Sequence, residues 1–472
     1  MIGTNLKSGK PVSHARALGN TEQNWCRAVA SGTGITVLAL QMAKPPPEIA
    51  AALADILHNL QTRHPLLAAR LHYNATTKAF SFLKTTTTPP PQKTIELHDA
   101  SQLLRLLSAA SDDPANLSPF QTILEHELNS SSWSDPNSFP CNGIEVFHVA
   151  VYAASDTKSV VVLRFHTSVC DRTTAVSVLR ELMEMVGGSG AQKGIVKEEE
   201  GKMGIESLIP AGLARKTVWA HGIDMLGYSV NSYRLTNLTF KNTKMPRRSE
   251  VVRLQMSSKY TNMILEGCKS RGIKLCGALA AAAIIAAHNS TKLHNISDTK
   301  KYGVVTLTDC RSILQPPLSP HHYGFYNSAI LNIQRVKGGE KMWDLAKKCY
   351  TDFADYKKCN KQFSDMADLN FLMSKAIENP SLTASSSLRT SLVTVFEDTV
   401  IDDSDHMQQT IGAEDYMGCA SVHGVGPSIA IFDTVRGGQL DCACVYPAPL
   451  HSRKQMSELV DRMTRVLIDG VE

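Results

Sequence analysis

Residues 159–186 read SVVVLRFHTSVCDRTTAVSVLRELMEMV and join an apolar strand to an amphipathic helix. The β-branched run at 159–165 predicts a buried strand, and apolar residues recurring at helical spacing after Thr173 predict a helix. His166 stands at the carboxyl end of the strand, and Asp171 stands near the first helical turn, where its carboxylate can accept backbone N–H groups. We therefore expect the functional site at this turn, because rigid elements aim the side chains at their ends into a cleft.

Length and composition indicate a globular chain with two lobes. The chain has 472 residues, of which 43% are hydrophobic and 20% charged, and its formal net charge is +5. A single hydrophobic core rarely extends over such a length, so we expect two lobes of roughly 200 residues each. The mild charge, without any Lys/Arg run longer than two residues, argues against nucleic acid as a partner.

The compartment follows from three features of the sequence. The most apolar window, residues 275–287, is Ala-rich and too short to span a bilayer, so we expect a buried helix there and no membrane partner. The first 20 residues lack the apolar stretch of a secretory signal, which favours a cytoplasmic protein. The 11 cysteines have no paired spacing and are then interpreted as reduced thiols.

The order of the predicted elements divides the chain into an N-terminal lobe at 1–187, a crossover linker at 188–249 and a C-terminal lobe at 250–472. The Pro-rich segment 84–93 and the Gly-rich, charged segment 187–202 predict loops. Helices flank strands in both halves, so the predicted fold class is α/β with mixed sheets. The predicted strands are 35–42, 146–153, 160–165, 251–256, 302–308, 325–334, 392–397, 417–422, 428–435 and 439–446. The predicted helices are 50–60, 100–109, 119–127, 173–186, 260–270, 276–288, 339–360, 365–377 and 452–469.

Several motifs follow one another in an order that is known from one superfamily. They are Leu60-Gln-Thr-Arg63-His64-Pro65-Leu66-Leu67, the turn with His166 and Asp171, Asp309-x-Arg311 with Pro316 and Pro317 behind it, and Gly324-x-x-Asn327. In this order and spacing the segment 60–465 resembles the BAHD acyltransferases and the related condensation domains and alcohol acetyltransferases.

The resemblance implies two lobes, each similar to a chloramphenicol acetyltransferase subunit, around a solvent channel. An acyl thioester would enter from one side and an alcohol or amine from the other. The histidine of the motif would be the general base, since imidazole titrates near neutral pH and can take the proton of the acceptor. The aspartate would be structural, so the resemblance implies a buried bidentate pair between Asp171 and Arg311.

The histidine motif of this chain departs from the spacing of the superfamily. The usual pattern is His-x-x-x-Asp, whereas this chain has four residues between His166 and Asp171. Counted back from Asp171, the catalytic position falls on Thr167. Either the turn holds one extra residue and His166 still reaches the channel, or threonine has replaced the base. Adjacent side chains on a strand point to opposite faces, so the two cannot reach one point unless the strand has ended.

A second departure lies near the C-terminus. BAHD enzymes usually carry Asp-Phe-Gly-Trp-Gly there, whereas residues 422–427 read VHGVGP. Gly424 and Gly426 remain and indicate a tight crossing between strands. The missing Asp and Trp suggest a side branch of the superfamily.

Other residues are candidates for the channel. Cys170 would stand at a helix N-terminus, where the pKa of a thiol falls, although packing is the simpler interpretation. His423 and Asn327 are possible channel residues by their place in the resembling motifs. The pair Cys442 and Cys444 has no further Cys/His partners that would complete a four-ligand site, so no metal is expected.

These observations lead to three hypotheses. The first is an acyl-CoA-dependent transfer of an acyl group to an alcohol or amine of a specialised metabolite, by a monomer that needs no cofactor besides the acyl-CoA co-substrate. In it His166 is the base, and Thr167 is a hydroxyl that can bond the thioester oxygen or the acceptor. The second keeps the channel for a lyase, cyclase or isomerase in which shape and desolvation matter more than a base. The third is a non-catalytic binding protein, because fold alone does not decide function.

Overall fold

The computed structural model describes residues 15–83, 93–103, 105, 117–130, 132–188, 201–217, 219, 221–222, 235–290 and 299–472. Most of the predicted loop at 84–93 and much of the predicted helix at 100–109 lie outside the described residues. The same holds for a large part of the predicted linker at 188–249. Elsewhere the predicted strands and helices are present with small shifts of their ends.

Within the described residues, the first half of the chain supplies a four-stranded sheet and four of the five strands of a second sheet. Its strands are β1 Ala15–Ala17, β2 Thr33–Met42, β3 Arg70–Asn74, β4 Ala79–Leu83, β5 Ile95–Asp99, β6 Ile144–Glu145, β7 Phe147–Ser155 and β8 Lys158–His166. Its α-helices are α1 Asn20–Ala30, α2 Pro46–Arg63, α4 Pro119–Leu128 and α5 Arg172–Val186. The predicted strands 146–153 and 160–165 are present as β7 and β8, which pair antiparallel as a hairpin.

The second half forms a seven-stranded sheet, again within the described part of the chain. Its strands are β9 Arg248–Met256, β10 Lys300–Asp309, β11 Asn327–Val336, β12 Arg389–Phe396, β13 Val400–Asp402, β15 Gly426–Arg436 and β16 Gln439–Ala448. Its α-helices are α7 Ser258–Ser270, α8 Leu275–Ser290, α9 Met342–Lys358, α10 Lys361–Ser364, α11 Met366–Glu378, α12 Asp405–Ile411 and α13 Arg453–Asp469. Mixed sheets flanked by helices confirm the predicted α/β class.

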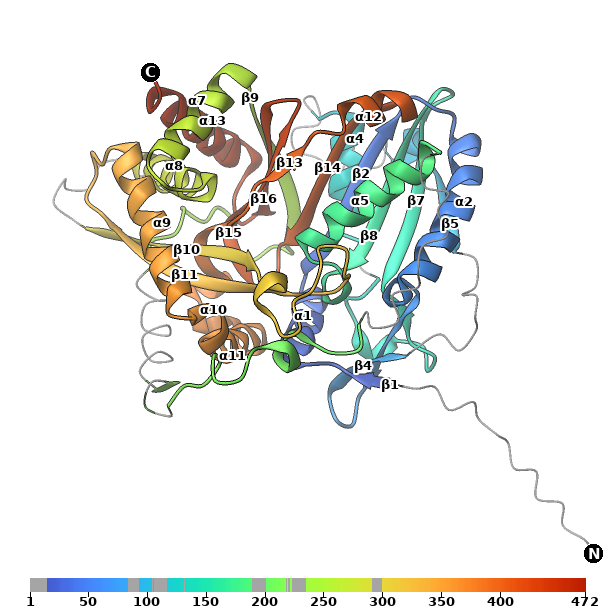
Figure 1. The fold of residues 1–472 in the computed structure, drawn as a ribbon, viewed down its shortest axis with the longest axis horizontal. Helices are drawn as coiled ribbons and strands as arrows, with labels where there is room; N and C mark the ends of the chain where they lie inside the picture. The colour runs from blue at the N-terminus through green and yellow to red at the C-terminus, as the bar shows by residue number, and fades with distance from the viewer. Residues whose placement is uncertain are drawn as a thin grey trace, which may run out of the picture.

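One strand from the second half belongs to the sheet of the first half. β14 Ala413–Val422 pairs antiparallel with β2 and forms the edge of the sheet β14-β2-β8-β7-β5. Figure 1 shows this late strand beside the early strand β2, although more than 370 residues separate Met42 from Ala413 along the chain. The division expected from the sequence, with everything after residue 250 in the second lobe, therefore does not describe β14. The pairing of β14 with β2 connects the two halves through main-chain hydrogen bonds.

The alternation of side chains along β8 sets the two faces of the first sheet. Val161, Leu163 and Phe165 pack into the core under α2 and α5. Val160 and Val162 face the other way, into a core shared with α4 and with strands of the second half. Both faces are therefore covered, which explains why the run 159–165 is apolar without alternation in the sequence.

The Ala-rich window at 275–287 is a buried helix, as predicted. It forms α8, whose side chains are buried on all sides in the core of the second lobe. Within the described residues no single helix has the length and apolarity to cross a membrane, and one bent pair, α7 with α8, passes that test by length and composition.

Candidate functional site

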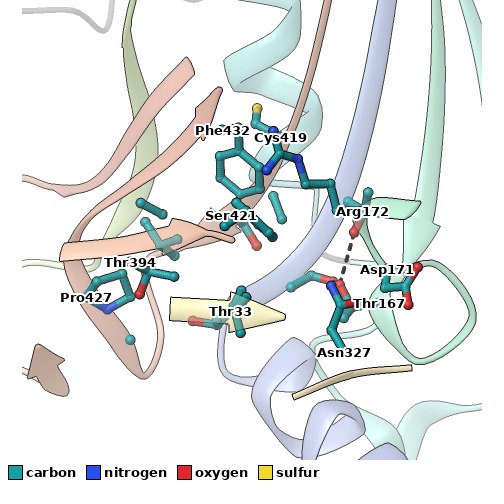
Figure 2. A pocket seen from close by; sticks show the side chains of 18 of the residues that line it. Thr33, Thr167, Asp171, Arg172, Asn327, Thr394, Cys419, Ser421, Pro427 and Phe432 are labelled. Carbon is teal, nitrogen blue, oxygen red and sulfur yellow. Dashed lines mark hydrogen bonds between the residues drawn. The ribbon is translucent and has the colours of Figure 1, made fainter. Parts of the chain in front are cut away.

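A cavity of about 400 Å³ lies between the two halves of the molecule. Its wall is built from β2, the turn after β8, α5, the strands β10, β11, β12, β14 and β15, and α11. Most of the lining side chains are apolar, among them Trp25, Leu38, Phe325, Leu331 and Phe432. Figure 2 shows polar side chains on this wall, among them Thr33, Thr167 and Asn327.

His166 does not line this cavity. It is the last residue of β8 and pairs with Ile35 of β2, so its side chain lies on the same face of the sheet as Val160 and Val162. The cavity lies on the opposite face, where Thr36 and Leu38 of β2 point. Because the strand continues through His166, alternation directs the imidazole away from the cavity.

The imidazole of His166 is enclosed by its own packing. The residue is 1% exposed, and its ring meets the ring of Trp133 edge-on at 5.3 Å between centroids. Its Nδ1 accepts the backbone N–H of Ser168 at 3.2 Å and lies 2.7 Å from the Ser168 hydroxyl. Burial lowers the pKa of His166 to about 3, so the ring is neutral at physiological pH. The expected contact of His166 with the channel is therefore absent, and the alternative with threonine at that position agrees with the geometry.

Thr167 occupies the cavity wall in the place expected for the base. Its hydroxyl donates to the carbonyl of Gly34 and lies 3.0 Å from the hydroxyl of Thr36. The donor of Thr167 is thus used inside the protein, and only its lone pairs are available to a ligand. The sequence indicated Thr167 as a possible channel-lining hydroxyl, and in the structure this residue lines the cavity.

Asp171 and Arg311 form a buried bidentate pair across the two halves. Arg311 Nη1 donates to Asp171 Oδ2 at 2.8 Å, and Nη2 donates to Oδ1 at 3.0 Å. The same carboxylate caps α5 by accepting the N–H of Thr174 at 2.9 Å and also accepts the N–H of Tyr326 at 2.8 Å. Its acceptor sites are filled, so this carboxylate holds the turn in place and is not free to take a proton from a ligand.

The other predicted site residues fall into two groups. Cys170, Asn327 and Gly426 line the cavity. Burial, followed by the charge of Asp171, raises the pKa of the Cys170 thiol well above its ordinary value, so this cysteine is not an activated nucleophile. Asn327 is 5% exposed, and its Oδ1 has no hydrogen-bond partner among the described residues.

His423 and Gly424 do not line the cavity. His423 Nδ1 lies 3.0 Å from the Ser249 hydroxyl, and burial, followed by the charges of Arg389 and Arg247, lowers its pKa to about 4. Gly424 packs against the C-terminal end of α1, where a Cβ would overlap Ser31. Its carbonyl accepts a hydrogen bond from Arg389, which agrees with the tight crossing expected from the sequence.

Sequence reasoning missed many of the polar lining residues, among them Thr33, Arg172 and Arg389. Thr33 lies at the start of β2 and Arg389 at the start of β12, and Arg172 packs its guanidinium 4.3 Å from the centroid of Phe396. Nothing in the local sequence distinguished Thr33 or Arg389, because their position on the wall follows from the pairing of distant strands. Among the described residues no group of three or more His, Cys, Asp or Glu side chains could hold a metal ion.

Comparisons with known proteins bear on the fold. No protein-family model and no curated protein sequence matches this chain. The trichothecene 15-O-acetyltransferase from Fusarium sporotrichioides has 11% identity and a TM-score of 0.69, over 96% of this chain and 94% of that chain. The epimerization domain from the third module of tyrocidine synthetase B has 12% identity and a TM-score of 0.60, over 98% of each chain. A nonribosomal peptide synthetase cyclization-docking bidomain from Sorangium cellulosum has 12% identity and a TM-score of 0.65, over 98% of this chain and 85% of that chain.

This chain therefore has the two-lobed fold of condensation domains and BAHD-like acyltransferases. According to their names, these three proteins are an acetyltransferase, an epimerization domain and a cyclization-docking bidomain. The fold is thus shared by proteins with different reactions, and the side chains of the cavity must decide the chemistry.

Proposed function

We propose that this chain binds a mainly apolar specialised metabolite between its lobes and promotes an intramolecular reaction of it, such as a cyclisation, isomerisation or elimination, without a histidine base. The protein would act by holding one conformation of the ligand and by excluding water. One observation carries the proposal. Thr167 lines the cavity between the lobes, whereas His166, the expected base, lies on the other face of the sheet.

The remaining titratable groups at the turn support a reaction without a protein base. The carboxylate of Asp171 accepts hydrogen bonds from Arg311 and from two backbone N–H groups. The thiol of Cys170 has a raised pKa and stays protonated at neutral pH. General base catalysis contributes roughly 10² to 10⁴ in rate, so an alcohol acceptor would lose that factor here.

Acyl transfer from acyl-CoA is the second candidate, and the fold shared with an acetyltransferase favours it. Without a base at the turn, the acceptor would be an amine. A neutral amine attacks a thioester carbonyl with its own lone pair and can release its proton to water afterwards, whereas an alcohol needs the proton removed during the attack. We propose for either reaction a cytoplasmic monomer.

Thiol release tests the two candidates against each other. The purified chain is incubated with acetyl-, malonyl-, benzoyl- and coumaroyl-CoA, each with tryptamine or with tryptophol, which share one skeleton and differ in amine and hydroxyl. In parallel, binding of the apolar dye N-phenyl-1-naphthylamine is followed by its fluorescence. The intramolecular reaction predicts dye binding that Ala329→Phe weakens, because Ala329 lines the cavity, and no thiol release above that of heat-inactivated protein.

The other outcomes are equally distinct. Thiol release with tryptamine alone, unchanged in His166→Ala, supports the second candidate. Thiol release with tryptophol that collapses in His166→Ala would contradict both proposals and restore the histidine as the base. Failure of the dye to bind would contradict a small-molecule cavity altogether.

A further inference from the structure

A buried guanidinium forms part of the cavity wall. Arg389 is 2% exposed and begins β12. Its Nε donates to the carbonyl of Ser387 at 3.1 Å, and Nη1 donates to that of Val422 at 3.0 Å. Further carbonyl acceptors are those of Pro427 for Nη1 and Gly424 for Nη2. A guanidinium has five N–H groups, so one N–H on Nη2 has no acceptor within the described residues.

The charge of Arg389 is not balanced by an acidic group. Its acceptors are neutral carbonyls, and the charge that acts on it is that of Arg247, which is also positive. Burial and then Arg247 lower the pKa of Arg389 well below its ordinary value. A buried cation without an anion is unfavourable in free energy, so an anion arriving in the cavity would stabilise this wall.

A second polar side chain lies beside this guanidinium without a partner. Thr33 is 7% exposed and lines the cavity, and its Oγ has no hydrogen-bond partner among the described residues. Figure 2 shows Thr33 on the pocket wall. A Cβ built on Gly426 would lie 3.9 Å from Arg389 Nη1 and 4.0 Å from Thr33 Cγ2. Thr33 and Arg389 therefore flank one point on the wall, which Gly426 leaves without a side chain; we call these three residues the Gly426 seat.

We propose that the Gly426 seat binds a carboxylate group of the ligand. One carboxylate oxygen would accept the free N–H on Nη2 of Arg389, and the other would accept the hydroxyl hydrogen of Thr33. Each donor belongs to the same side chain as the atom that lies beside Gly426, which is Nη1 of the guanidinium and the methyl Cγ2 of Thr33. Hydrogen bonds between a guanidinium and a carboxylate are charge-assisted and about twice as strong as neutral ones. The seat belongs to a mainly apolar cavity, so the ligand class is an acid with a mainly apolar body. This inference rests on the proposed small-molecule function and names its substrate class.

Calorimetric titration of the full chain with three probes of similar shape tests the seat. The probes are 4-phenylbutanoate, 4-phenylbutanamide and butylbenzene, which carry an anionic, a neutral polar and an apolar end. We expect the carboxylate to bind about tenfold more tightly than the amide, since this is a modest value for one charge-assisted contact. Gly426→Ala and Thr33→Val should reduce that preference to less than about threefold, while butylbenzene binding changes little.

The two variants are chosen to fold. A Cβ on Gly426 meets its neighbours at ordinary contact distances, and removing the unpartnered hydroxyl of Thr33 leaves no new unpaired group. Met183→Leu, on α5 at another part of the cavity, is the matched control and should keep the preference.

Equal binding of the carboxylate and the amide by the unchanged chain would overturn the carboxylate seat. A tenfold preference that survives in Gly426→Ala would overturn it as well, because the carboxylate would then bind elsewhere. If none of the three probes binds, the proposed small-molecule function itself is contradicted, and this outcome is distinguishable from failure of the seat alone.

Discussion

The neutral, enclosed imidazole of His166 has a consequence for the acid stability of the protein. An unperturbed histidine titrates near pH 6.5, and burial lowers the pKa of His166 to about 3 in the folded chain. The unfolded chain therefore binds one more proton at this residue between these two values. The free energy of unfolding therefore has its full value, as far as His166 is concerned, above about pH 6.5. It decreases as the pH falls from about 6.5 toward 3.

We expect His166→Asn to flatten this dependence. Between pH 6 and pH 4 the free energy of unfolding of the unchanged chain should fall by about 1.4 kcal/mol per pH unit more than that of the variant. Urea unfolding at a series of pH values measures the difference between the two proteins, so other titrating residues cancel. Parallel curves, or an NMR titration of the His166 ring near pH 6.5, would show a ring that water reaches and would reopen its role as a base.

Among the secondary-structure elements, α5 depends on a partner from the other half of the chain. Asp171 caps this helix and is paired with Arg311, which follows β10. Both side chains are almost fully buried, at 0% and 2% exposure. Removal of one partner leaves a buried charge without its counter-ion, which costs more than loss of an exposed pair.

Arg311→Met should therefore lower the free energy of unfolding by about 3–5 kcal/mol, as measured by urea denaturation at pH 7. The matched control is Arg462→Met, which breaks the more exposed pair with Glu458 within α13 and should change stability by less than about 0.5 kcal/mol. A loss of equal size in both variants would mean that the Asp171 pair does not hold the turn.

Two glycines separated by one residue at the crossing before β15 differ in their surroundings. A Cβ on Gly424 would overlap the carbonyl and hydroxyl oxygens of Ser31, whereas a Cβ on Gly426 meets nothing closer than 3.9 Å. We expect Gly424→Ala to destabilise the protein by about 1–3 kcal/mol through overpacking. Gly426→Ala should stay within about 1 kcal/mol of the unchanged chain. Thermal unfolding of both variants under one set of conditions makes the comparison, and the reverse order would show that the crossing is looser than described.

At the scale of the whole molecule, β14 makes the two halves interdependent. It completes the first sheet from the second half of the chain by pairing with β2. A fragment of residues 1–187 would expose β2 as an unpaired, largely apolar edge, which promotes aggregation. It would also lose Arg311, the partner of Asp171.

We expect this fragment to be unfolded or aggregated when it is expressed alone, and the full chain to unfold in one cooperative transition. Circular dichroism and size-exclusion chromatography of the fragment, with the full chain as control, measure the outcome. A monomeric fragment with native-like strand content and a sharp thermal transition would show that the first lobe folds without β14.

Local patterns in the sequence determined most of the elements. The apolar run before His166, the helical spacing after Thr173 and the Ala-rich window at 275–287 predicted β8, α5 and α8, because burial requires apolar side chains at the spacing of each element. The superfamily resemblance that the motifs carry also implied the two-lobed fold and the pairing of Asp171 with Arg311, which the structure contains. Each of these depends on neighbouring residues or on motifs that can be read along the chain.

Only the tertiary structure decided which residue of the turn meets the cavity. His166 and Thr167 are adjacent, and a shift of one residue in the end of β8 would exchange their faces. That end is set by the pairing of His166 with Ile35 and by the packing of Trp133, which no local pattern contains. The place of β14, and with it the meeting of Thr33, Arg389 and Gly426, likewise depends on the pairing of strands far apart in sequence. Strand register therefore determines which side chains face the cavity and so its chemistry. Composition and the spacing of apolar residues determine the helices and strands that form its wall.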